Sequence, residues 1–190
     1  LEYYFGEAVQ QEADTILITG AVQSNFVRMA AAAAAKLDLA CHIQLEERVS
    51  DAGANYHDSG NVLLDHILGA TIHTYPDGED EAGADANLQS IANELRLAGK
   101  RPYIIPLAMG HPPLGALGYI QAAIELKSQL KKSDFEIDQI FVASGSGSTH
   151  AGLLFGCRSL KWPIRITGVC VRRRREQQIN RIEKRCHDIS

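Results

Sequence analysis

Apolar and polar positions along this chain fall into blocks that predict strands and helices in turn. Short apolar runs predict strands at residues 15–19, 40–45, 70–75, 102–106, 139–143 and 164–171. Apolar residues recur at helical spacing in the segments between these runs. Such alternation predicts an α/β fold in three layers, with open parallel sheets covered by helices on both faces.

The helical spacing places particular side chains on one face of each predicted helix. Residues 1–9 also form an amphipathic helical pattern, although the chain opens with neither Met nor a helix cap, so we expect it to be an internal part of a longer protein. The predicted inward faces are Val27, Ala31, Ala34 and Leu37; Val62, Leu63, His66 and Ile67; Leu88, Ile91 and Leu95; and Ile120, Ala123, Ile124 and Lys127.

The segment from Ser144 to Thr149 joins a predicted strand to a predicted helix at residues 149–160. Glycines let backbone N–H groups approach an anion, and a helix N-terminus presents unsatisfied donors at the positive end of its dipole. The turn therefore predicts an anion site suited to a compact monophosphate. The alternative is a plain turn in which Ser148 or Thr149 only caps the helix. The residues expected to bind phosphate are Gly145, Ser146, Gly147, Ser148 and Thr149.

Two nucleotide-binding motifs fit this turn poorly. A dinucleotide fingerprint needs glycine where the chain has His150, and an acidic residue where Arg172 follows the next strand. A phosphate loop of the Walker type needs lysine directly after Gly152, where the chain has Leu153. A monophosphate thus remains the better fit.

A second strand-to-helix turn has the same character. Gln23, Ser24 and Asn25 stand together after Gly20, at the start of an alanine-rich helix. Ser24 alone would suffice as a cap, so three polar residues indicate contact with a ligand as well. The backbone N–H groups suit a carboxylate, and the Asn25 amide suits a phenolic oxygen. Together the two turns suggest a phosphorylated aromatic cofactor that carries an amino acid, and pyridoxal 5′-phosphate is that ligand.

Composition narrows the class of protein. The chain has 190 residues, of which 45% are hydrophobic and 22% charged, as in ordinary globular proteins. A net charge of -4 gives no general attraction to nucleic acid or to an anionic membrane, and no apolar run approaches membrane-spanning length. We therefore expect a cytoplasmic protein. The cysteines show neither zinc-ligand nor disulfide spacing, and two of them, Cys41 and Cys170, are expected in strand cores.

Four segments together resemble the family of D-cysteine desulfhydrases and 1-aminocyclopropane-1-carboxylate deaminases. They are GAVQSN at residues 20–25, AAKL at 34–37, LGALGY at 114–119 and GSTHAG at 147–152. Members of this family are pyridoxal-phosphate enzymes of the tryptophan-synthase-β fold type, known as fold type II. The resemblance covers essentially the whole chain.

The resemblance implies a role for each site residue. Asn25 would bond the cofactor's O3′, Ser24 would contact the substrate carboxylate or move a proton, and Gln23 would line the same pocket. The loop from Gly145 to Thr149 would hold the cofactor phosphate. The family also implies two domains, a small one over residues 1–110 and part of a large one over 111–190, with the cofactor between them. The full-length protein would be a homodimer.

The resemblance also implies a Schiff-base lysine in a Gly-Gly-Asn-Lys segment, which would lie shortly before Leu1. None of the lysines present suits that role, so we expect the chain alone to be inactive. The lysines are Lys36, Lys100, Lys127, Lys131, Lys132, Lys161 and Lys184.

The sequence is compatible with more than one function. D-cysteine desulfhydrase activity, which releases hydrogen sulfide, ammonia and pyruvate, is preferred narrowly. The segment from His111 to Pro113 favours the deaminases. Phe26 differs from the residue that often follows Gln-Ser-Asn in this family. From another class, a non-catalytic phosphate-ligand module or an NADP-binding domain using Arg172 to Arg175 is the alternative. His111 and His150 are expected to be structural more often than catalytic.

Overall fold

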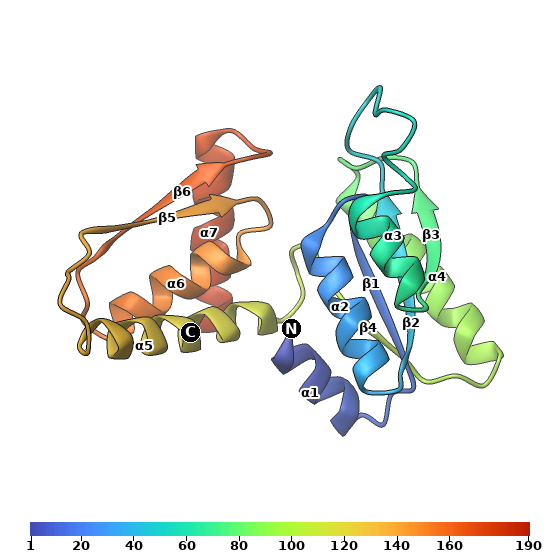
Figure 1. The fold of residues 1–190 in the computed structure, drawn as a ribbon, viewed down its shortest axis with the longest axis horizontal. Helices are drawn as coiled ribbons and strands as arrows, with labels where there is room; N and C mark the ends of the chain where they lie inside the picture. Colours follow the sequence, from blue (N-terminus) through green and yellow to red (C-terminus); the bar gives the residue numbers. More distant parts are fainter. The chain divides into compact units, whose positions relative to one another are not determined.

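The computed structural model describes residues 1–190 and divides into two compact units. Unit 1 runs from Tyr3 to Gly110 and includes Leu1, and unit 2 runs from His111 to Ser190 and includes Glu2. Figure 1 shows the elements of both units in chain order. No helix is both long enough and apolar enough to span a membrane.

Unit 1 contains a parallel sheet with the strand order β3-β2-β1-β4. The register aligns Thr15 of β1 with Ala40 of β2 on one side and with Pro102 of β4 on the other. Its elements are α1 (Glu2–Gln10), β1 (Thr15–Ala21), α2 (Asn25–Lys36), β2 (Ala40–Glu46), α3 (Gly60–Ile67), β3 (Thr71–Tyr75), α4 (Glu81–Leu97) and β4 (Pro102–Ile105).

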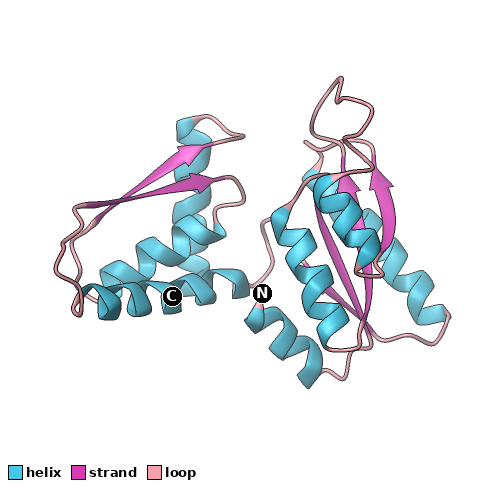
Figure 2. Ribbon diagram, in the orientation of Figure 1, coloured by secondary structure: helices cyan, strands magenta, loops and turns pink.

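Helices cover both faces of this sheet (Figure 2). On one face Leu17 of β1 packs against Leu88, Ile91 and Ala92 of α4. Helix α2 lies against β1 and β2, and its alanines at 30, 31 and 34 are fully buried because their small side chains allow close packing on the sheet. The predicted α/β fold with parallel strands and helices on both faces is therefore confirmed.

Unit 2 pairs two parallel strands; one of its three helices packs against them, and the other two pack mainly against that helix. Its elements are α5 (Leu114–Leu130), β5 (Gln139–Ser144), α6 (Ser148–Ser159), β6 (Arg165–Cys170) and α7 (Arg175–Ile189). The core of the unit groups Ala123 of α5 with Leu153 and Cys157 of α6 and with Ile164. All six predicted strands are present within one or two residues of their expected ends.

Helices α5 and α6 approach each other closely because α6 carries two glycines on the contact face. A Cβ atom on Gly152 would overlap the Ala116 backbone oxygen and would lie 2.7 Å from the Tyr119 Cβ. A Cβ on Gly156, one turn further along, would lie 2.9 Å from the Ala123 Cβ. These two glycines therefore set the distance between the helices.

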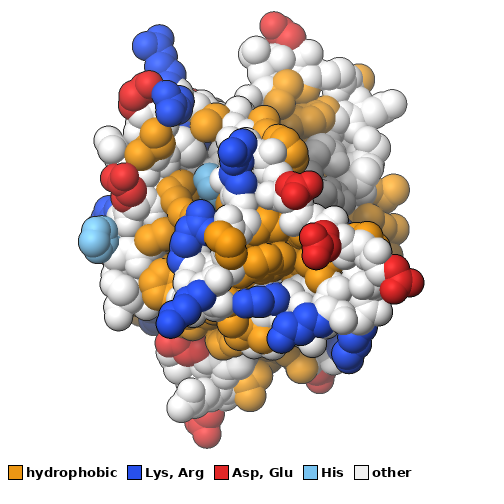
Figure 3. Space-filling model, turned by 90° about the vertical axis from the view of Figure 1, so that its left-hand side faces the viewer, with side chains coloured by type: hydrophobic (Ala, Val, Ile, Leu, Met, Phe, Trp, Pro, Cys, Tyr) orange, Lys and Arg blue, Asp and Glu red, His pale blue; other side chains and the backbone are white.

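Several sequence-based expectations about the core are wrong. Leu37, on the predicted inward face of α2, is 47% exposed, and Ile124, on that of the helix at residues 114–130, is 43% exposed. In α3 only Val62 of the predicted inward face is buried, while Ile67 is 70% exposed and the helix buries Asp65 instead. Cys170 ends a strand as expected, but its side chain is exposed, as are Phe141 and Val169 of the same two-stranded sheet. On the face drawn in Figure 3, apolar side chains likewise reach the surface between lysines and arginines.

Candidate functional site

The turn after β1 is compact because Gly20 allows the start of α2 to fold back over the strand. A Cβ on Gly20 would lie 2.7 Å from the Val27 Cγ2 and 3.1 Å from the Ser24 Oγ. Ser24 is the N-cap of α2, and its Oγ accepts a hydrogen bond from the Val27 N–H at 3.3 Å. The Ser24 hydroxyl proton is not used in this bond, so the hydroxyl can also donate to a ligand.

Replacing Ser24 with alanine is expected to lower the stability of unit 1 by about 1 kcal/mol, because the Val27 N–H loses its acceptor. Amide hydrogen exchange of β1 and β2 measures this change in unit 1 alone. Ser24→Asp keeps a capping oxygen and is the control. Equal protection in the alanine variant and the original chain would contradict the cap.

Gln23 connects this turn to the segment before α3. Its Nε2 donates to the backbone oxygens of Tyr56 at 2.6 Å and Ser59 at 3.0 Å, and its Oε1 accepts from the Asn61 N–H at 2.9 Å. Gly60 has φ of +60°, and a Cβ there would lie 2.5 Å from the Gln23 Oε1. The Gln23 amide thus fixes the segment that faces the start of α2.

Asn61 also fixes the orientation of the neighbouring Asn25 side chain. The Asn61 Nδ2 donates to the Gln23 backbone oxygen at 2.9 Å and to the Asn25 Oδ1 at 3.0 Å. Because the Asn25 oxygen accepts this bond, the amide orientation is set and its Nδ2 hydrogens point elsewhere. Asn25 is exposed at the first position of α2, so this NH₂ group is available to an acceptor such as a phenolic oxygen.

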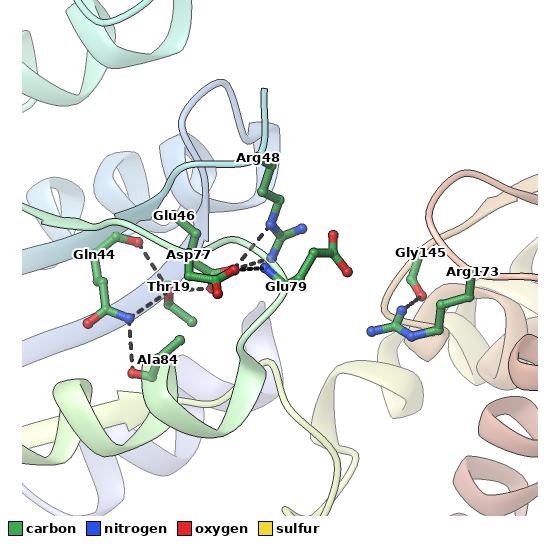
Figure 4. A network of polar contacts seen from close by, with 9 residues as sticks. All are labelled: Thr19, Gln44, Glu46, Arg48, Asp77, Glu79, Ala84, Gly145 and Arg173. Carbon is green, nitrogen blue, oxygen red and sulfur yellow. Dashed lines mark hydrogen bonds and ion pairs between the residues drawn. The ribbon is translucent and has the colours of Figure 1, made fainter. Parts of the chain in front are cut away.

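A buried polar cluster lies at the carboxyl ends of β1 and β2 (Figure 4). The Thr19 Oγ1 donates to the Glu46 Oε1 at 2.7 Å, and the Gln44 Nε2 donates to the Ala84 oxygen of α4 at 2.9 Å. The Arg48 guanidinium bonds the other Glu46 oxygen at 2.5 and 3.1 Å. These bonds tie the strand ends beside the Gly20 turn to α4, which holds that turn in place.

In unit 2 the loop between β5 and α6 turns at a glycine in the left-handed region. Gly147 has φ of 91° and ψ of -13° and is the N-cap of α6, with no side-chain cap. A Cβ at this position would lie 3.0 Å from the Ile182 Cδ1 of α7. Both the backbone angle and the close approach favour glycine here.

The carbonyl oxygens of this loop accept hydrogen bonds from side chains of α7 and from Arg173, which precedes that helix. The Ser146 oxygen accepts from the Arg181 Nε at 2.8 Å and from the Arg185 Nε at 3.1 Å. The Gly145 oxygen accepts from Arg173 at 3.0 Å, as Figure 4 shows, and from the Gln178 Nε2 at 3.1 Å. Both carbonyl groups therefore point toward α7.

The orientation of these carbonyls fixes where the loop N–H groups point. The C=O and N–H of a trans peptide lie on opposite sides, so the N–H groups of Ser146 and Gly147 point away from α7. The N–H groups of Ser148 and Thr149 open α6 and have no partner within the helix. These donors, with three nearby hydroxyl groups and the positive end of the helix dipole, have the chemistry that a compact anion requires.

His150 takes part in a hydrogen-bonded chain behind the loop. The Gln178 Nε2 donates to the Ser144 Oγ at 2.9 Å, and the Ser144 Oγ lies 3.0 Å from the His150 Nδ1. A Cβ on Gly168 would overlap the His150 ring, so this glycine makes room for it. Burial lowers the pKa of His150, which favours the neutral ring. This arrangement fits the structural role expected for His150.

The comparisons with known proteins agree with a phosphate-bearing cofactor. The model of the family described as pyridoxal-phosphate dependent enzymes matches residues 1–185. The chain belongs to this family. Pyridoxal phosphate is therefore the cofactor of the family, which favours it over the nucleotide alternatives considered above.

Curated relatives in the pyridoxal-phosphate family support the resemblance to D-cysteine desulfhydrases. The chain is 38% identical over 184 residues to the D-cysteine desulfhydrase of Serratia proteamaculans, covering 97% of this chain and 54% of the relative. It is 39% identical over 173 residues to the D-cysteine desulfhydrase of Salmonella paratyphi B, covering 91% of this chain and 51% of that relative. The chain thus spans about half the length of the curated relatives it matches.

Solved structures support the same fold. An ACC deaminase homologue matches with a TM-score of 0.81 and 34% identity, over 99% of this chain and 54% of that one. An O-ureido-L-serine synthase matches with a TM-score of 0.65 and 13% identity, over 88% of this chain and 48% of that one. The second likeness concerns the fold alone, which is fold type II. No group of three or more His, Cys, Asp or Glu side chains is arranged to hold a metal ion.

Some residues at these two turns were not predicted from the sequence. Asn61 and the donors Arg173, Gln178, Arg181 and Arg185 bind the predicted site residues from 28 to 39 positions away along the chain. From the sequence, the arginine run at residues 172–175 indicates only an alternative ribose-phosphate site. A signal was present in the helical spacing of Gln178, Arg181 and Arg185, which share one face of α7.

Proposed function

We propose that the protein containing this chain is a pyridoxal-phosphate lyase that converts D-cysteine to hydrogen sulfide, ammonia and pyruvate. The observation that supports this most strongly is the 38–39% identity to D-cysteine desulfhydrases over nearly the whole chain. In this reaction the bound cofactor withdraws electrons from the substrate Cα. We further propose that the intact protein is a cytoplasmic homodimer.

The loop residues Gly145, Ser146, Gly147, Ser148 and Thr149 are proposed to hold the cofactor phosphate. A phosphate group fits the loop because the N–H groups of Ser146 and Gly147 point away from α7 and those of Ser148 and Thr149 open a helix. Gly145 and Gly147 let the backbone approach the anion. The hydroxyl groups supply further donors to the phosphate oxygens.

The turn at the start of α2 is proposed to bind the polar groups of the cofactor and the substrate. The Asn25 Nδ2 would donate to the cofactor's phenolic oxygen, since the Asn25 Oδ1 is already held by Asn61. Ser24 would donate its hydroxyl proton to the substrate carboxylate or move a proton at the substrate. Gln23 would line the pocket, with its amide oriented by the segment from Tyr56 to Asn61.

We also propose that the 190-residue chain alone does not turn over substrate, because its lysines are badly placed. Lys36 ends α2 and Lys100 precedes β4, which puts both at the amino ends of the strands, away from the Ser24 turn. The Lys127 Nζ donates to the Leu160 oxygen at the far end of α6 from the phosphate loop. Lys131, Lys132 and Lys161 lie at the same end, and Lys184 pairs with Asp188.

ACC deaminase activity is the second candidate. It is favoured by the His111-Pro112-Pro113 segment and by the 34% identity to the ACC deaminase homologue. Both reactions would use the same phosphate loop, so the choice rests on the substrate pocket.

Assays of the intact protein and of the chain alone test these proposals. We expect the intact protein to form pyruvate and sulfide from D-cysteine faster than 2-oxobutyrate from the cyclopropane amino acid. L-Cysteine is the control substrate. The chain alone, mixed with pyridoxal phosphate, should release sulfide only at the rate of free cofactor. A preference for the cyclopropane substrate would overturn the first proposal, and cofactor-dependent turnover by the chain alone would overturn the second.

A further inference from the structure

We propose that Arg181 and Arg185 are positioning residues for phosphate binding by the loop before α6. They act through the Ser146 peptide group and do not contact the ligand themselves. This inference rests on the proposed role of the loop as the phosphate site.

The two arginines fix the Ser146 carbonyl group from one side. Its oxygen accepts the Nε–H groups of Arg181 at 2.8 Å and of Arg185 at 3.1 Å, which uses both of its lone pairs. The peptide plane between Ser146 and Gly147 therefore cannot rotate without breaking two charge-assisted hydrogen bonds. The Gly147 N–H is held on the opposite side, where the phosphate is proposed to lie.

The loop needs such support because of its composition. Ser146 lies between Gly145 and Gly147, and glycines have more accessible backbone conformations than other residues. A free loop of this kind would lose much conformational entropy when it closes on an anion. Ordering the loop beforehand removes that cost from the binding step.

The arginines also act through their charge. Arg185 is only 4% exposed, and guanidinium groups keep their proton in proteins, so a positive charge is buried behind the loop. Donation to the Ser146 oxygen polarises the peptide and makes the Gly147 N–H a stronger donor. Gln178, 3% exposed, supports the preceding Gly145 carbonyl without adding charge. Position and charge thus both favour a dianion on the open side of the loop.

Amide NMR of the 190-residue chain, titrated with inorganic phosphate and with pyridoxal phosphate, tests the inference. We expect the amides of Ser146, Gly147, Ser148 and Thr149 to shift in the original chain, and Arg181→Gln to weaken the fitted Kd about tenfold or more. Arg175→Gln removes the same charge from an exposed position on α7 and is the matched control. It should change the Kd less than twofold.

Arg181→Lys separates geometry from charge, and it preserves the fold should the glutamine variant not fold. Lysine keeps the charge but lacks the Nε–H, so we expect affinity between that of Arg181→Gln and the original chain, with the Gly147 amide proton shifted upfield. Binding by the original chain with an unchanged Kd in both Arg181 variants would overturn this inference alone. Absence of any loop shift in the original chain would instead overturn the phosphate site and the inference that depends on it.

Discussion

Replacing Gly152 with valine is expected to destabilise unit 2 by about 3 kcal/mol or more, because α5 and α6 cannot separate without losing core contacts. A side chain there would meet the Ala116 backbone and the Tyr119 Cβ, and backbone atoms cannot move aside as a flexible side chain would. Denaturant unfolding followed by Trp162 fluorescence measures this effect, since the lone tryptophan packs against the unit 2 core.

Gly6→Val is the matched control for this helix substitution. Gly6 lies in α1, and a Cβ there meets nothing within 4 Å, so valine should leave stability unchanged or raise it by a few tenths of a kcal/mol. An unchanged Trp162 transition in the Gly152 variant would show that α5 and α6 have room to adjust.

Replacing Asp65 with asparagine is expected to stabilise unit 1 above pH 6 and to have less effect near pH 4. Asp65 is 1% exposed, and neither of its carboxylate oxygens accepts a hydrogen bond. Burial raises its pKa from 3.8 to about 6, a rise limited by the charges of Arg28 and His66. A rise of roughly two pKa units corresponds to about 3 kcal/mol.

The stability of unit 1 depends on pH because the folded chain binds the Asp65 proton more tightly than the unfolded chain does. Between about pH 4 and pH 6 the folded chain holds the Asp65 proton while the unfolded chain has released it. Stability attributable to this group is therefore present below its unfolded pKa and is lost as the pH rises through its folded pKa. Above pH 6 the buried carboxylate is charged and opposes folding, and asparagine removes that charge.

Amide hydrogen exchange of β1 and β2 at several pH values measures this difference. Asp58→Asn, at an exposed position in the neighbouring turn, is the control and should give a pH profile parallel to that of the original chain. A stability gain for Asp65→Asn that is the same at pH 4 and pH 8 would contradict a titrating carboxylate.

The strands were predictable from the sequence because each is a short apolar run between polar turns, and parallel strands buried on both faces need such runs. The inward face of α3 was not predictable. Its eight residues include Leu63, His66 and Ile67 at helical spacing, yet the helix turns Val62 and Asp65 inward. In a helix this short, contact with α2 outweighs the apolar periodicity.

The two polar turns were predictable because glycine and small polar residues at a strand-to-helix junction have a local physical meaning. The contacts that orient the two turns were not predictable. The donors to the Gly145 and Ser146 oxygens come from Arg173 and from α7, which begins about 30 residues after the loop. Sequence spacing does not show which face of that helix turns toward the loop. Likewise Asn61 reaches Asn25 only through the folding of the segment before α3.

The pairing of β4 with β1 also sets the order in which the chain can acquire structure during synthesis. Next to this strand pair, the Arg101 N–H donates a hydrogen bond to the Asp14 carboxylate, 87 positions earlier in the chain. Unit 1 must therefore close a long loop before its sheet is complete. That closure needs no residue beyond Gly110, whereas every element of unit 2 is made afterwards. On the ribosome, unit 1 can therefore finish folding while the segment that carries the phosphate loop is still being translated.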